Sequence, residues 1–317
     1  MSLGTESKKS KFYAGIEGGG TTWKCVFADQ DCEIISSHSI PTDTPERTLQ
    51  RVVQFYESCQ KEFGEISGIG VGSFGPANID ISSSNYGQIT STPKLGWSYF
   101  NVVKSLEKVF AAPVLFDTDV NVAARAEYEF GNASGLNNFA YVTVGTGIGV
   151  SVYMNGSVAQ GDSHFESGHM LVPKHDADTN FDGVCQFHSG CLEGLASAPS
   201  IEKRWSQTPK NLPDDHIAWD IESYYLGILC MNLSLVYRPR RIILGGGVMN
   251  RKCLFEKIRE QYSLMMASYV GQCGLLQDYI TSAGLLEDSG VKGAVLLAQD
   301  ASLPVSYTHL RAHETYR

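Results

Sequence analysis

Apolar and polar positions follow the same pattern in two segments of the chain, and glycines interrupt each segment. Residues 12–28 read FYAGIEGGGTTWKCVFA, and residues 139–154 read FAYVTVGTGIGVSVYM. An apolar strand, a glycine turn and a second apolar strand are typical of a β-hairpin. The repetition predicts a duplicated domain, in which each half carries a glycine hairpin that faces a shared cleft.

Helical and extended patterns come after the two hairpins in alternation. In residues 45–63 apolar side chains recur at helical spacing, so a helix is expected there. Residues 81–100 are rich in turn formers and predict a loop. Further helices are expected over 101–110, 121–131, 198–205, 220–237, 254–266 and 291–299, and further strands over 66–76, 113–120 and 240–249. Strands and helices that alternate in this way indicate an α/β fold.

Composition limits the classes of function that need to be considered. The 317 residues suffice for two domains, and 43% hydrophobic with 19% charged residues is ordinary for a globular protein. The net charge of -9 argues against a nucleic-acid partner. No apolar run reaches the roughly 20 residues that span a bilayer, and the start is polar without a signal core. We therefore expect a cytoplasmic protein with no membrane or nucleic-acid partner.

Potential metal ligands are concentrated in residues 165–194. Cys185, His188 and Cys191 form the pattern C-x-x-H-x-x-C, and His169 precedes them. Thiolate and imidazole suit tetrahedral Zn²⁺, and four protein ligands leave no position for water, so the spacing predicts a structural zinc. The alternative is a set of buried thiols with a hydrogen-bonded core histidine. A glycine-rich segment with few apolar residues disfavours that alternative.

Other histidines and cysteines fit the metal pattern less well. His164 and His175 lie nearby but apart from the tight cluster. His309 and His313 have a metal-like spacing, but they lie in a C-terminal stretch that resembles translated adapter sequence. In a reducing compartment the cysteines outside the cluster are expected to be free thiols. These are Cys25, Cys32, Cys59, Cys230, Cys253 and Cys273.

Glycines are also concentrated at residues 15–22, 145–149 and 245–248. Glycine lets backbone N–H groups approach an anion closely, and threonine hydroxyls add donors, so these segments suit the phosphates of a nucleotide. A tight hairpin turn is the alternative for any one of them. Neither G-x-G-x-x-G at the start of a helix nor G-x-x-x-x-G-K-[ST] occurs, which excludes the Rossmann and P-loop interpretations.

Seven motifs in order resemble one family: EGGGTT, GVGSFGP, TPKLGW, DTDVNVAARAE, ESGHM, C-x-x-H-x-x-C-L-E-G and LGGGV. Over residues 12–299 the chain resembles the ROK family (repressors, open reading frames, kinases), and most of all its zinc-containing bacterial-type fructokinases. The resemblance implies two actin-like ATPase (ribonuclease H-like) α/β domains with an interdomain cleft. The expected N-terminal domain covers 12–117 and is joined by the last helix, at about 289–301. The expected C-terminal domain covers 118–288 and contains a zinc loop at 166–193. A disordered lead-in is expected at 1–11 and a non-native tail at 304–317.

The resemblance also assigns roles to individual residues. Asp119 is implied as the general base, since phosphoryl transfer needs a group that accepts the proton of the attacking hydroxyl. The alternative is that Asp117 or Asp119 only caps a helix. The residues implied to contact the sugar are Gly72, Thr118, Glu166, His169 and Glu193, with His169 also on zinc. Those implied at the nucleotide are Glu17, Gly19, Gly20, Thr21, Thr22, Gly145, Thr146, Gly147, Gly245, Gly246 and Gly247.

Three positions depart from the family pattern. Thr118 stands where the family usually has Asn, which puts one sugar contact in doubt. Glu17 replaces the usual Asp, as in the fructokinase-like branch, and would reach Mg²⁺ through water. Thr22 stands where a Lys is common, which leaves Lys24 as a substitute.

The resemblance thus implies a homodimeric kinase that uses ATP, Mg²⁺ and a structural Zn²⁺ to convert D-fructose to D-fructose 6-phosphate. Mannose, glucose and N-acetylhexosamines are the alternative substrates. A sugar-sensing regulator is an alternative from another class, but only about ten residues precede Phe12, too few for a helix-turn-helix module. A kinase-like protein that binds sugar without turnover is the third alternative.

Overall fold

The computed structural model describes residues 11–269 and 274–303. The predicted non-native tail, with His309 and His313, lies outside these residues, as do Cys273 and all of the predicted lead-in except Lys11. Two compact units divide the described chain. Residues up to Val122, together with those from Val291 onward, form the first unit, and Ala123–Gly290 form the second.

The first unit is built on a five-stranded sheet of order β3-β2-β1-β4-β5. β1 pairs antiparallel with β2, and β2 with β3, while β1, β4 and β5 run parallel. The predicted first hairpin is therefore confirmed, with Gly19 and Gly20 in the β1–β2 turn. The strands are β1 (Phe12–Gly18), β2 (Thr22–Ala28), β3 (Ile34–Pro41), β4 (Ile66–Ser73) and β5 (Val114–Thr118).

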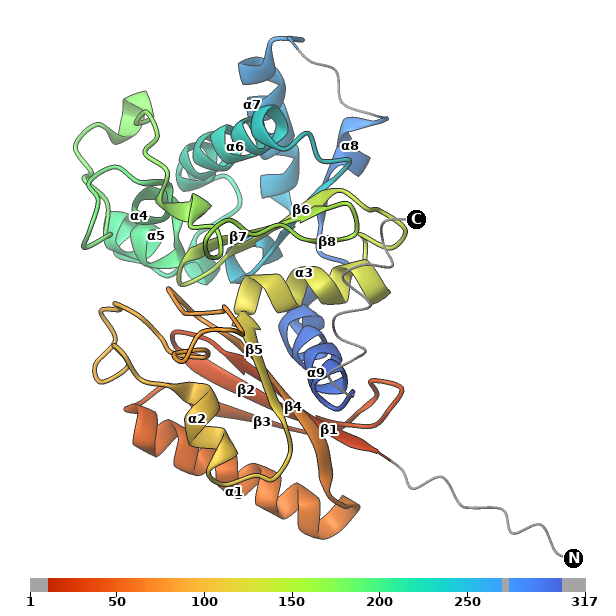
Figure 1. Cartoon of the computed structure of the whole chain (residues 1–317). Helices are drawn as coiled ribbons and strands as arrows, with labels where there is room; N and C mark the ends of the chain where they lie inside the picture. Colours follow the sequence, from red (N-terminus) through yellow and green to blue (C-terminus); the bar gives the residue numbers. More distant parts are fainter. Residues whose placement is uncertain (1–10, 270–273, 304–317) are drawn as a thin grey trace, which may run out of the picture. The chain divides into compact units, whose positions relative to one another are not determined.

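Helices cover both faces of this sheet because side chains alternate between the faces along each strand. Ala14 and Ile16 pack in a core with α1 (Pro45–Phe63) and α2 (Val102–Glu107). Tyr13 and Val26 pack on the opposite side with α9 (Ser289–Ala301). Figure 1 shows α9 along the sheet, although it comes from the far end of the sequence.

The second unit repeats the same sheet plan, with the order β8-β7-β6-β9-β10 when it is written in the same direction. β6 and β7 form the predicted second hairpin, and β9 and β10 run parallel to β6. The duplicated α/β fold predicted from the two hairpins is thus confirmed. The strands are β6 (Phe139–Val144), β7 (Ile148–Met154), β8 (Ser157–Val158), β9 (Ile242–Gly245) and β10 (Ile280–Ser282).

Helices α6 and α7 pack together in the core of the second unit. α3 (Asp119–Phe130) begins in the first unit and ends in the second. The remaining helices are α4 (Leu192–Ala196), α5 (Ala198–Trp205), α6 (Ala218–Val236), α7 (Cys253–Met266) and α8 (Leu276–Tyr279). The predicted helices are present within a few residues of the expected bounds.

Three strands end earlier than the sequence pattern predicted. The strand predicted over 66–76 stops at Ser73. Asp119 and Val120, predicted in a strand, begin α3, because the Thr118 hydroxyl accepts the backbone N–H of Asn121 and caps the helix. The strand predicted to reach residue 249 stops at Gly245, because Gly246 has φ of +92° and turns the chain into a short 3-10 helix. Strands β3, β8 and β10 and helices α4 and α8 were not predicted.

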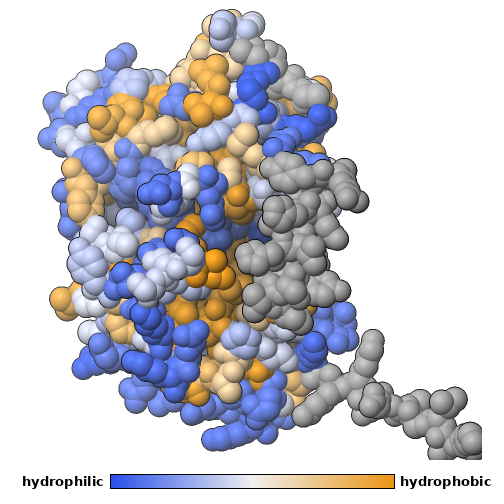
Figure 2. Space-filling model, viewed as in Figure 1, coloured by the Kyte–Doolittle hydropathy of each residue, from blue (hydrophilic) through white to orange (hydrophobic). Residues whose placement is uncertain are grey.

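The described part of the chain contains no helix long and apolar enough to cross a bilayer. On the face drawn in Figure 2, hydrophobic and hydrophilic residues are interspersed.

Candidate functional site

The four predicted zinc ligands come together in the second unit. The ligand atoms of His169, Cys185, His188 and Cys191 all lie within 4.8 Å of one another. Cys185 Sγ is 3.7 Å from Nδ1 of both His169 and His188, and Cys191 Sγ is 3.7 Å from His169 Nδ1. In tetrahedral zinc, bonds of about 2.3 Å to sulfur and about 2.0 Å to nitrogen place such ligands roughly 3.5 Å apart. The donors and their spacing therefore fit zinc.

Close backbone packing explains the glycines around these ligands. A Cβ on Gly168 would lie 1.9 Å from the carbonyl oxygen of Ile148, so only glycine lets His169 approach strand β7. Gly183 has φ of +90°, and a Cβ there would lie 2.8 Å from the Gly194 carbonyl oxygen. Gly168 and Gly183 are thus parts of the site that the ligand spacing alone did not reveal.

His169 connects the metal cluster to two carboxylates. Its Nδ1 faces the thiols, while its Nε2 lies 3.7 Å from Glu193 Oε1 and 4.0 Å from Glu166 Oε2. A carboxylate beside the second nitrogen of a metal-binding imidazole fixes its tautomer and ring orientation. The pKa of the Glu166 carboxyl is raised, because desolvation outweighs the opposing effect of the neighbouring His169. The structure thus brings together Glu166, His169 and Glu193, all of which were predicted to contact a sugar.

Glu193 also contacts the second glycine turn. Its Oε2 accepts the backbone N–H of Ile148 at 2.9 Å, and a Cβ on Gly147 would lie 2.5 Å from the same oxygen. The N–H of Ala198 donates to the Gly145 carbonyl, so the start of α5 holds the turn as well. Thr146, at the tip of the turn, is exposed. A ligand at this turn would therefore lie beside the carboxylate of Glu193.

The third glycine segment borders a pocket in the second unit. A Cβ on Gly246 would lie 2.4 Å from the Val144 carbonyl oxygen, so this glycine lets the segment pack against β6. Gly247 lines a pocket of about 450 Å³. The pocket lining is mostly apolar and also carries three cations and one carboxylate, Asp214, which pairs with Arg251. Its other lining residues include Val248, Asn250, Lys210, Asp214, Trp219, Arg251 and Lys252. These cationic residues had no sequence signal, because they come from separate segments.

The first glycine loop forms a tight turn in the first unit. The Gly19 N–H donates to the Thr22 carbonyl at 3.0 Å, and a Cβ on Gly19 would lie 2.7 Å from that oxygen. Thr42 fixes the turn through its hydroxyl, which donates to the Gly19 carbonyl. Lys24 Nζ lies 4.0 Å from Glu17 Oε2 on the paired strand. Gly20 and Thr21 occupy the tip of the turn.

Asp119 lies in the first turn of α3 and is half-buried. Its Oδ1 accepts the N–H of Val120, whereas Asp117 Oδ1 accepts Nδ2 of Asn121. The backbone N–H of Asn121 donates to the Thr118 hydroxyl, so the threonine caps this N–H in the first turn of the helix. Thr118 is buried. Asp119 therefore occupies the strand-to-helix junction without being the side chain that caps this amide.

Gly72 has a packing role that the sequence did not indicate. A Cβ at this position would lie 2.2 Å from Val122 Cγ2, so the glycine lets β4 pack closely against α3. Gly72, Thr118 and Asp119 belong to the first unit, and the cluster around His169 belongs to the second. The roles predicted for these three residues stay predictions.

Comparison with known proteins gives the family. A sequence model of the ROK family matches residues 13–301. The chain belongs to the ROK family. Among its curated relatives, a fructokinase from Pediococcus pentosaceus is 38% identical over 286 residues, which cover 90% of this chain and 97% of the relative.

Two further comparisons agree with the ROK assignment. The fructokinase of Lactococcus lactis subsp. cremoris is 37% identical over 271 residues, 86% of this chain and 91% of the relative, whereas relatives named glucokinase are 26–27% identical. A crystal structure of a ROK glucokinase from Streptomyces griseus, in complex with glucose and AMPPNP, matches with a TM-score of 0.73 at 21% identity. The match covers 92% of this chain and 99% of that one. The predicted family and fold are confirmed.

Proposed function

We propose that the protein is an ATP-dependent hexose kinase that converts D-fructose and ATP to D-fructose 6-phosphate and ADP. The observation that carries the proposal is the placement of Glu166 and Glu193 beside Nε2 of His169, whose Nδ1 belongs to the metal cluster. Carboxylates suit the recognition of sugar hydroxyls because they accept hydrogen bonds directionally, and a metal-bound imidazole can donate one from its protonated Nε2. The fructokinase relatives, which are more similar than those named glucokinase, support fructose among the hexoses.

In the proposed reaction the 6-hydroxyl oxygen of fructose attacks the γ-phosphorus of ATP. The bond from that phosphorus to the β–γ bridging oxygen breaks, and ADP leaves. Asp119 accepts the proton of the attacking hydroxyl, a role that contributes about 10²–10⁴-fold in rate where a general base is used. The position of the half-buried Asp119 at the start of α3 is compatible with this role.

The glycine segments are proposed to hold the nucleotide. Backbone N–H groups of the turns at Gly19–Thr22 and 145–147 would face phosphate oxygens. The pocket beside Gly247 would take the adenosine, because its mostly apolar lining, with Val248 and Trp219, suits a neutral aromatic base. Glu17 would hold Mg²⁺ through water, and the ion would supply charge neutralisation at the phosphates.

Zinc is proposed to be structural. The set of two thiols and two imidazoles matches its ligand preference, and all four positions are supplied by the protein. The ion would hold the zinc loop in the shape that places His169 between the cluster and the two carboxylates. We further propose a homodimer, from the family resemblance. From the composition and the net charge of -9 we propose a cytoplasmic location and no nucleic-acid partner.

The reaction is tested by the release of ADP from ATP and Mg²⁺. Fructose, mannose, glucose, N-acetylglucosamine and N-acetylmannosamine are compared, with Asp119→Asn beside the parent. We expect fructose to give the highest kcat/KM and Asp119→Asn to lower kcat at least about 100-fold at unchanged zinc content. Exposed Glu129 on the same helix provides the control, Glu129→Gln, which should keep the parent rate.

Other results of this assay would change the proposal. A higher kcat/KM with another sugar would keep the kinase and replace the substrate. Absence of turnover with every sugar, in folded protein that contains zinc, would favour a sensor that binds sugar without catalysis.

A further inference from the structure

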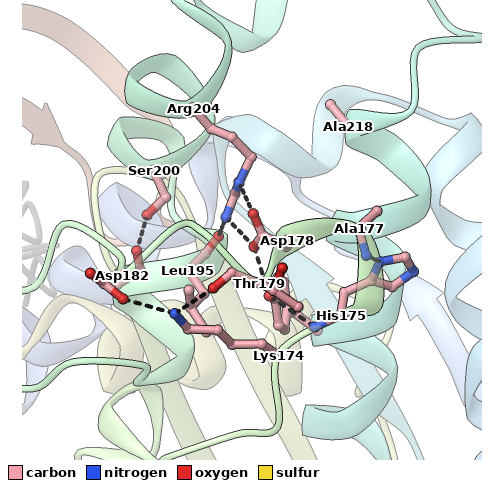
Figure 3. A network of polar contacts seen from close by, with 12 residues as sticks. Lys174, His175, Ala177, Asp178, Thr179, Asp182, Leu195, Ser200, Arg204 and Ala218 are labelled. Carbon is pink, nitrogen blue, oxygen red and sulfur yellow. Dashed lines mark hydrogen bonds and ion pairs between the residues drawn. The ribbon is translucent and has the colours of Figure 1, made fainter.

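A buried ion pair lies in the zinc loop, seven residues before the first cysteine ligand. Asp178 ends a short 3-10 helix (Asp176–Asp178), and its side chain is only 3% exposed. Its Oδ1 accepts Nε of Arg204 at 2.8 Å, and its Oδ2 accepts Nη2 of the same guanidinium at 2.9 Å. The Tyr225 hydroxyl also donates to Oδ2, at 2.7 Å. Figure 3 shows the two parallel contacts between Arg204 and Asp178.

Arg204 joins the zinc loop to the helix that carries Glu193. Arg204 comes from α5, and its side chain is 7% exposed. Nη2 also donates to the carbonyl of Leu195 on α4 at 2.8 Å, and the guanidinium lies 4.1 Å from the ring centroid of Phe181 in the loop. One cation therefore contacts Asp178 and Phe181 of the loop and one point of α4, two residues after Glu193. Figure 3 shows its contacts with Asp178 and Leu195.

A second acidic side chain, Glu222, lies near this pair. Glu222 on α6 is also buried, and burial raises its pKa well above the ordinary value, an effect that the nearby Arg204 opposes. Breaking a buried, hydrogen-bonded pair by removing one partner leaves an uncompensated buried charge, which is strongly destabilising.

An exposed pair in the same loop provides a natural contrast. Lys174 Nζ lies 2.9 Å from Asp182 Oδ1, but Asp182 is 85% exposed. Exposed pairs of this kind contribute little, because water and salt screen them. Asp178 and Asp182 thus offer two carboxylates four residues apart, each paired with a cation, that differ mainly in burial.

We propose that the Asp178–Arg204 pair is a second anchor of the zinc loop, one that does not depend on the metal, and that Arg204 is a positioning residue for Glu193. The metal cluster holds the end of the loop at residues 185–191, and the ion pair holds residues 176–181. Arg204 fixes α4 relative to the loop, and so sets where the Glu193 carboxylate lies beside His169.

The first test needs no variant. Amide hydrogen exchange is measured on the parent protein before and after zinc is removed with a chelator. Chelation should speed exchange at least tenfold at Val184, whose N–H donates to the Gly194 carbonyl, and at Gly190, whose N–H donates to the Asp182 carbonyl, because Val184 adjoins the metal-bound segment and Gly190 lies in it. The N–H groups of Asp178 and Phe181 should change less than threefold. Equal loss of protection in both parts would show that the ion pair holds nothing without the metal, and would overturn the proposal.

The second test compares Asp178→Asn with the matched control Asp182→Asn. Asp178→Asn should speed exchange at residues 176–181 at least tenfold, and it should speed zinc release to a chromogenic chelator several-fold. Asp182→Asn should stay within twofold of the parent in both measurements. Identical behaviour of the two variants would contradict the proposal. If Asp178→Asn fails to fold, Arg204→Lys, which keeps the charge but not the paired contacts, replaces it.

The positioning of Glu193 rests on the proposed function and is tested separately. Arg204→Lys should raise the KM for fructose at least fivefold and the KM for ATP by a smaller factor, because the Glu193 carboxylate is displaced directly and the glycine turn only through its contact with Glu193. An unchanged fructose KM would remove the positioning role. If the parent shows no fructose turnover, the proposed function fails, while the exchange and zinc-release tests still decide whether the anchor exists.

Discussion

The two units have the same sheet order but differ in the segments that come after the glycine hairpin. In the first unit β2 leads to the eight-residue strand β3 and then directly to α1. In the second unit β7 leads to the two-residue strand β8 and then to the zinc loop, α4 and α5. The same framework thus supports an ordinary sheet edge in one unit and a metal-ligand cluster with two carboxylates in the other. Function differs between the halves through inserted segments, while the strand order stays the same.

The strand-to-helix junctions differ in a related way. After β5 the chain places Asp119 in the first turn of α3. After β10 the chain instead supplies backbone N–H donors to the carboxylate of Glu127, which lies on α3. Glu127, which is fully buried, accepts the N–H groups of Gly284 and Leu285 and the Ser289 hydroxyl. One helix therefore carries a carboxylate proposed for chemistry near its start and a structural carboxylate near its end.

Loss of the metal should have the largest effect, and it should be confined to the second unit. His188→Ala removes one of the four ligands, so zinc should be lost and the unfolding free energy should fall by about 5 kcal/mol, or roughly 10–20 °C in Tm. Metal analysis and thermal unfolding measure both quantities. Chelation should lower the Tm of the parent equally and leave the variant unchanged. A variant that retains full zinc would remove His188 from the ligand set.

Removal of the structural carboxylate should have the next largest effect. Glu127→Ala leaves the N–H groups of Asn132, Gly284 and Leu285 without their acceptor, at roughly 1–3 kcal/mol each, so we expect a loss of about 4 kcal/mol. Urea unfolding measures the change. Exposed Glu129 provides the matched control, and Glu129→Ala should change stability by less than about 0.5 kcal/mol. Equal effects of the two substitutions would refute the structural role of Glu127.

Helix packing in the first unit should give a smaller effect that does not involve the metal. A Cβ on Gly70 would lie 2.0 Å from the Ala294 carbonyl oxygen of α9, so Gly70→Ala should cost about 2 kcal/mol by overpacking. Gly161→Ala is the control, since the nearest atom to its Cβ would be 3.9 Å away. Zinc content should be unchanged in both variants. Loss of zinc from Gly70→Ala would show that the two units are not independent in this respect.

The sequence predicted the parts of the structure that rest on local patterns. The two hairpins, the long helices and the group of four potential metal ligands were predicted because periodicity and ligand spacing are visible within short segments. Strand β3 was missed because its residues, IISSHSIP, are mostly polar or exposed at the edge of the sheet. Strand β10 has only three residues, too few for an alternating pattern.

Contacts between distant positions had no such signal. Asp178 pairs with a residue 26 positions later and with Tyr225, 47 positions later. Glu127 accepts donors more than 150 positions away. A single acidic residue looks the same in sequence whether it is exposed or buried against a distant cation. Only the fold distinguishes Asp178 from Asp182, or Glu127 from Glu129.

The proposed function assigns sugar recognition to carboxylates of the second unit and proton transfer to Asp119 of the first. Calorimetric titration of fructose into zinc-loaded Asp119→Asn and Glu193→Gln tests it most directly. We expect Asp119→Asn to bind fructose within about threefold of the parent affinity. Glu193→Gln should bind at least about tenfold more weakly at unchanged zinc content, as expected for loss of a hydrogen bond to a charged group. Parent-like binding by Glu193→Gln, or equal loss of binding in both variants, would contradict this division.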